Sequence, residues 1–203
     1  MGKKRIKIQV PDIEYLDDRF EFIKNPILKE NLTISLQYVV FLVKVETDFE
    51  TTGAVKYSIF KNAIQYTASI VEGVMHYGLE FAIQNGIVNE GSVMPKMDTY
   101  TEKKLLYKID PYTQIMGVKQ VKKFEKFKKN TQFKTVCDAY KKGKLIDSDL
   151  LKSINELREK RNKIHLAGLK KIEDDYTKDD IAEAFNVAFS AIIEVGRITT
   201  TVS

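Results

Sequence analysis

Residues 56–84 form the longest regular pattern in the chain, and the pattern is helical. Apolar and small side chains recur at spacings of three and four from Phe60 to Ala82, which places them on one face of an α-helix. Gly86 follows as the expected end of that helix. A helix of this length must bury its apolar face against other helices, so the pattern predicts a helical bundle.

Three further segments predict long helices: residues 118–140, the stretch that follows Asp147 or Ser148, and the stretch that begins at Thr177. Asp147 and Ser148 are both good N-caps, and Thr177 opens a capping box with Asp in place of Glu. Residues 32–48 are rich in β-branched side chains but lack Gly and Pro, and their length favours a helix. The sequence therefore predicts a mainly all-α fold, a bundle of four to five long helices.

Two segments predict a little β-structure. Residues 4–10 alternate polar and apolar side chains, as a short strand does, and Pro11 ends them. Glycines and prolines interrupt the helical pattern further along, and residues 105–109 can pair with residues 114–118 as a small hairpin.

The chain is 203 residues long, which suits one domain with an appendage. We divide it into an N-terminal segment, residues 1–50, which packs on the bundle and to which no role is assigned, and a helical domain, residues 51–203. The helical domain carries an irregular insert near residues 87–118.

Composition removes several classes of function. Cys137 is the only cysteine, and His76 and His165 are the only histidines, so a disulfide framework and a Cys- or His-rich metal centre are excluded. No phosphate-cradling glycine loop is present. No stretch approaches the roughly 18 apolar residues of a membrane span. We expect a cytoplasmic protein that needs neither a metal nor a cofactor.

Basic charge is concentrated in one quarter of the chain. The net charge is +5, whereas residues 101–150 alone carry 13 basic and 6 acidic side chains, a surplus of 7. Aromatic residues interleave the lysines, and such a surface suits a phosphate backbone. A solvated helix face whose aromatic side chains pack inward explains the same pattern. The lysines expected to contact RNA are Lys122, Lys123, Lys126, Lys128 and Lys129.

One cluster of side chains suits catalysis. On the helix after Asp147, Arg161 lies in the middle of the apolar stripe, His165 and Arg158 share its edge, and Asn162 lies farther round. An imidazole exchanges protons near neutral pH, and a guanidinium stabilises charge on a phosphate. Together they can cleave RNA without a metal, by activating the ribose 2′-hydroxyl. An ion pair between Arg161 and a neighbouring helix explains the same positions.

The run Leu157–His165, LREKRNKIH, resembles the signature of the HEPN superfamily. The hallmark of that family is an Arg, often followed by a polar residue, then four to six residues and a His. His165 matches the histidine, and Arg158 fits the spacing with six intervening residues. Arg161 and Asn162 match the Arg–polar pair, but only three residues separate Arg161 from His165. The resemblance, which covers roughly residues 56–200, therefore leaves open which arginine is the functional one.

The resemblance implies a metal-independent endoribonuclease in a defence, abortive-infection or toxin–antitoxin system. It implies a homodimer whose two motifs share one cleft, an RNA substrate, and an antitoxin or other partner protein. The alternative is a non-catalytic HEPN-like module that binds RNA, a nucleotide or a protein. If the resemblance is set aside, the sequence predicts a helical protein whose basic face binds an acidic partner. Glu72 and His76, one turn apart on a helix, either support the motif or form an ordinary interior contact.

Overall fold

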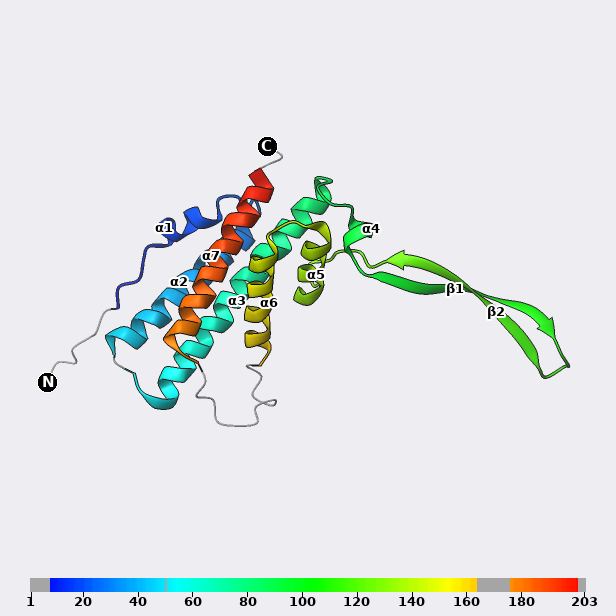
Figure 1. The fold of residues 1–203 in the computed structure, drawn as a ribbon, viewed down its shortest axis with the longest axis horizontal. Coiled ribbons are helices and arrows are strands. Elements are labelled where there is room, and N and C mark those ends of the chain that lie inside the picture. The colour runs from blue at the N-terminus through cyan, green and yellow to red at the C-terminus, as the bar shows by residue number, and fades with distance from the viewer. Residues whose placement is uncertain (1–7, 50, 164–175, 201–203) are drawn as a thin grey trace.

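The computed structural model describes residues 8–49, 51–163 and 176–200, without the side chains of residues 98–102 and 119–122. It confirms a mainly helical fold with one antiparallel hairpin, which projects from a bundle of long helices (Figure 1). The helices are α1 (Ile13–Asp17), the 3₁₀ turn η1 (Asp18–Phe20), α2 (Pro26–Asp48), α3 (Gly53–Gln84), α4 (Glu90–Val93), α5 (Phe133–Gly143), α6 (Ser148–Asn162) and α7 (Lys178–Thr200); the strands are β1 (Lys96–Lys108) and β2 (Gln114–Phe124).

Helix α3 is the central element of the bundle. It packs against α2 and α7 along its length and also contacts α5 and α6 (Figure 1). Val71, Val74, Met75 and Leu79 on this helix are fully buried. The helix ends near Asn85, and Gly86 follows with a φ of +70°, a backbone conformation that glycine adopts without strain. The predicted helix and its predicted end are therefore confirmed.

Helices α3, α5 and α7 meet at a closely packed junction. The Tyr140 hydroxyl, fully buried, donates a hydrogen bond to the Met75 carbonyl at 3.0 Å. A Cβ atom added at Gly78 would overlap with that hydroxyl and would lie 2.7 Å from Val195 Cγ1. Close packing therefore requires glycine at position 78.

Side-chain caps fix the starts of the last two helices. The Asp147 carboxylate accepts hydrogen bonds from the backbone of the first turn of α6, the shorter one 2.7 Å long. The Thr177 N–H donates to Asp180 Oδ2 at 2.9 Å, and the Asp180 N–H donates to Thr177 Oγ1 at 3.2 Å. The predicted capping box is confirmed, and of the two N-caps that the sequence offered for α6 the structure has Asp147.

The hairpin is longer than the sequence predicted. Its strands pair over Lys96–Lys108 and Gln114–Phe124, with two irregularities in the register. The helix predicted over residues 118–140 is therefore wrong at its start, because residues 118–124 belong to β2 and α5 begins only at Phe133. In residues 118–124, lysines and apolar residues recur at mixed spacings that resemble a helical face. These residues form a strand because they pair with β1, and that pairing is a non-local interaction.

The strand predicted at residues 4–10 is not found at residues 8–10, and its first four residues lie outside the described part of the chain. In the described ranges, no helix is both long and apolar enough to cross a bilayer.

Candidate functional site

A groove lies where α3 meets the start of α2, the end of α6 and the connection between β2 and α5. Its volume is about 650 Å³. We call it the His76 groove, because His76 is its imidazole and Glu72, Glu80, Lys129 and Arg161 are its charged side chains. Segments far apart in the sequence thus bring one arginine of the predicted cluster, one predicted RNA-binding lysine and the Glu72–His76 pair to one site.

Arg161 reaches the groove from the last turn of α6. Its guanidinium lies 3.1 Å from the Glu72 carboxylate of α3, and both side chains are partly exposed. Helical projection placed Arg161 in the middle of the apolar stripe; the long side chain instead carries its charge to the edge of the α3–α6 contact. The ion pair to a neighbouring helix, one of the two explanations of the pattern, is present.

His76 is half-buried and lies between the two acidic side chains of the groove. Its ring is 5.8 Å from the ring of Phe127. Burial lowers the pKa of His76 below 6.5, and Glu72, Glu80 and a backbone hydrogen bond with Thr131 partly oppose that effect. The imidazole is therefore neutral at pH 7 and is able to accept a proton.

Arg158 occupies a different environment. Arg158 is 9% exposed, and its guanidinium lies 2.6 Å from the Glu159 carboxylate. Its Nε is buried and has no hydrogen-bond partner among the described atoms. Burial raises the pKa of Cys137 on α5 to about 12, and the nearby charge of Arg158 lowers it only in part. Arg158 thus packs toward α5 and does not line the His76 groove.

The other two members of the predicted cluster lie at and beyond the end of α6. Asn162 is exposed and is the last residue of the helix, with Lys163 as its C-cap. The helical projection of His165 assumed that the helix continues to that position. His165 lies outside the described residues.

The predicted RNA-binding lysines are spread along the end of β2 and the connection that follows. Lys129 lines the groove, and Lys123, Lys126 and Lys128 are exposed; the side chain of Lys122 lies outside the description. Hydrogen bonds anchor this connection, among them those from the Phe127 N–H to Glu90 Oε1 at 2.8 Å and from the Lys128 N–H to Thr131 Oγ1 at 2.9 Å. The lysines therefore lie on a connection whose backbone is anchored beside the groove.

The sequence left the role of His76 open, and the structure places it in the groove. Its spacing of one turn from Glu72 was the signal. No signal marked Lys160, which binds Asp180 at 2.9 Å and Glu183 at 2.6 Å and so joins α6 to α7. Among the described side chains, no group of three or more His, Cys, Asp or Glu is placed to hold a metal ion.

No protein-family model, no curated protein and no solved structure matches this chain. The HEPN resemblance therefore depends on the spacing of Arg158, Arg161, Asn162 and His165 within a helical chain.

Proposed function

We propose that this protein is a HEPN-like, metal-independent endoribonuclease and that the His76 groove holds the RNA strand. One observation carries the proposal: Arg161 of the motif helix, His76 of α3 and Lys129 line the same groove. A guanidinium, a neutral imidazole and an ammonium group are the side chains that bind a phosphodiester and move a proton beside it.

Arg161 is the arginine that contacts the scissile phosphate. Its ion pair with Glu72 uses one terminal nitrogen, and its side chain is 34% exposed, so further N–H donors remain for a phosphate oxygen. Arg158 is buried and acts as a positioning residue that holds α6 against α5. Lys129 and the exposed Lys126 and Lys128 bind neighbouring phosphates of the strand.

Cleavage uses the two imidazoles. Neutral His76 removes the proton of the ribose 2′-hydroxyl, whose oxygen attacks the adjacent phosphorus. His165, the histidine of the motif, protonates the departing 5′-oxygen, and Asn162 orients the ribose. The products are a 2′,3′-cyclic phosphate and a free 5′-hydroxyl. As the resemblance implies, a homodimer brings two motifs together, in a defence, abortive-infection or toxin–antitoxin setting with an antitoxin or other partner protein.

A second candidate is a non-catalytic HEPN-like module that binds RNA or a protein. One observation favours it: Glu72 already pairs with Arg161, and Glu72 and Glu80 both act on His76. In such a module the ion pair in the groove stabilises the α3–α6 contact, and the exposed lysines bind the RNA or protein partner.

An RNA-cleavage assay in EDTA separates the two functions. We compare the native protein with Arg161→Gln, His76→Gln and His165→Ala, and use Lys152→Ala, an exposed change on α6, as the matched control. The nuclease proposal expects cleavage by the native protein and the control, and losses of about 10²–10⁴-fold in the histidine variants. Salt-dependent RNA binding without cleavage would support the RNA-binding module. Neither cleavage nor RNA binding would refute the nuclease and the RNA-binding module, and would leave a protein as the partner.

A further inference from the structure

The hairpin formed by β1 and β2, which we call the hairpin arm, exposes apolar side chains although it is only a two-stranded sheet. It projects from the bundle (Figure 1), and Leu106, Tyr107 and Ile109 near its tip are 64%, 65% and 58% exposed. An isolated two-stranded hairpin is marginally stable in water, and both of its edges offer unpaired backbone groups. These features are typical of an arm that is covered by another surface.

The same arm is basic. Residues 96–124 contain seven lysines and three carboxylates, a surplus of four positive charges. Lys103, Lys104 and Lys108 are exposed in the distal half. The turn carboxylate of Asp110 is engaged by the backbone N–H groups of Tyr112 and Thr113, at 2.7 and 2.8 Å. The partner of the arm must therefore be both apolar and acidic.

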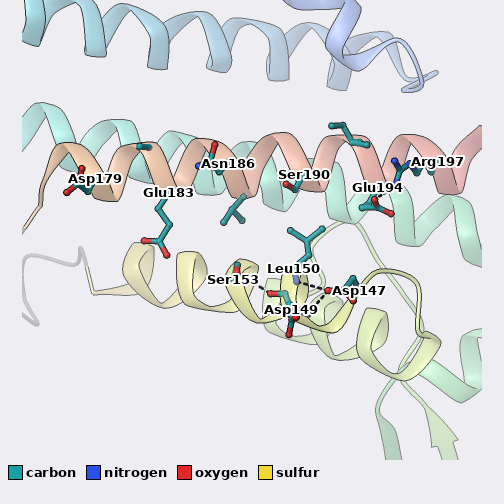
Figure 2. A pocket seen from close by; sticks show the side chains of 13 residues that line it. Asp147, Asp149, Leu150, Ser153, Asp179, Glu183, Asn186, Ser190, Glu194 and Arg197 are labelled. Carbon is teal, nitrogen blue, oxygen red and sulfur yellow. Dashed lines mark hydrogen bonds and ion pairs between the residues drawn. The ribbon is translucent and has the colours of Figure 1, made fainter.

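A groove with those properties lies between α6 and α7 on the bundle. It has a volume of about 820 Å³, and Leu150, Val187 and the 54%-exposed Ile193 supply apolar surface. Figure 2 shows its acidic side chains along α7 and at the start of α6. Asp149 and Asp179 have no side-chain partner within the described part of the chain. The groove is lined by five carboxylates and one cation, Arg197: Asp147, Asp149, Asp179, Glu183 and Glu194. Glu194 pairs with Arg197, Glu183 pairs with Lys160 of α6, and Asp147 caps α6, so Asp149 and Asp179 are the carboxylates left to face the arm.

We propose that the hairpin arm of one copy docks in the α6–α7 groove of a second copy. The two surfaces match in charge and in apolar character. The arm segment also fits within the groove, because Asp179 to Arg197 spans about 27 Å of helix and Lys103 to Lys108 spans about 17 Å of strand. The arm points away from the bundle that carries it, so its own groove is not its target (Figure 1). Reciprocal docking of two arms closes a two-fold dimer.

RNA is not the occupant of the α6–α7 groove, because the carboxylates that line the groove repel phosphate groups. The arm itself has a basic surface that RNA also suits, so the test must separate the two partners. The docking proposal does not depend on the nuclease proposal, because none of its residues lines the His76 groove.

Charge reversal on the full chain tests the docking. The arm variant is Lys103→Glu with Lys104→Glu, and the groove variant is Asp149→Lys with Asp179→Lys. Molar mass is measured by light scattering over a concentration series, with thermal melting to confirm folding. We expect a dimer of the 23.4 kDa native chain and a rise of at least about tenfold in the dissociation constant of each variant. An equimolar mixture of the two variants should recover a heterodimer, because it contains one native contact and one doubly reversed contact.

Three results would overturn the proposal. The first is a native chain that stays monomeric across the series. The second is a dimer that both reversals leave unchanged, or a mixture that fails to recover association although both variants melt as the native chain does. The third is an arm variant that loses RNA retention while its dimerisation is unaltered, which would assign the arm to RNA.

Discussion

The guanidinium of Arg161 lies 3.1 Å from the carboxylate of Glu72, and this contact joins the motif helix α6 to the central helix α3. His76 lies one turn farther along α3, and its pKa responds to the same carboxylate. One side chain, Glu72, is therefore coupled both to the proposed phosphate ligand and to the proposed base.

Replacing Glu72 with Gln tests that coupling. The change removes a charge that raises the pKa of His76, so that pKa should fall further below 6.5. Partial exposure limits the expected loss of stability to about 0.2–1 kcal/mol. The measurement is a proton NMR titration, in which His165→Ala assigns the two histidine signals. An unchanged or higher pKa of His76 would contradict the described geometry.

His76 also predicts how stability depends on pH. Burial lowers its pKa in the folded state below 6.5, so the unfolded chain binds a proton at a pH where the folded chain does not. The free energy of unfolding should therefore decrease as the pH falls through 6.5 and level off below the folded pKa. Urea denaturation between about pH 5 and pH 8 measures the slope. His76→Gln should flatten it, and an identical slope in that variant would assign the effect to another group.

Gly78→Ala should destabilise the junction of α3, α5 and α7. The added methyl group meets the Tyr140 hydroxyl and Val195 in a fully packed region, at a cost of about 1–3 kcal/mol. Gly73→Ala on the same helix is the matched control, because its new Cβ meets the end of the Leu32 side chain at 3.1 Å. Alanine favours a helix by about 1 kcal/mol, so the control should be neutral or stabilising. Equal melting temperatures for the two variants would refute the packing argument.

The thiol of Cys137 should be inert in the folded protein. Burial raises its pKa to about 12, so almost no thiolate forms at neutral pH. We expect a thiol reagent to label Cys137 only as the chain unfolds, with labelling that follows the urea transition. Rapid stoichiometric labelling of the native protein would mean that α5 opens on the time scale of the reaction.

The helices and caps could be predicted because their signals are local. The spacing of apolar residues on α3 and the Thr177–Asp180 capping box both act within a few residues. The start of α5 could not be predicted, because residues 118–124 are drawn into a strand by pairing with β1, a non-local effect. Non-local contacts also explain why only part of the candidate site could be predicted. Spacing identified Arg161, but only tertiary packing brings Lys129 and His76 beside it.

We propose that the His76 groove cleaves RNA without a metal, and the chemistry of the products tests this activity most directly. Single-stranded RNA is incubated in EDTA with the native protein and with Arg161→Gln, and the new ends are identified by mass spectrometry. We predict 2′,3′-cyclic phosphate and 5′-hydroxyl ends from the native protein, and a large loss of those ends in the variant. Intact RNA with the native protein, or the same products at the same rate from both proteins, would contradict the account.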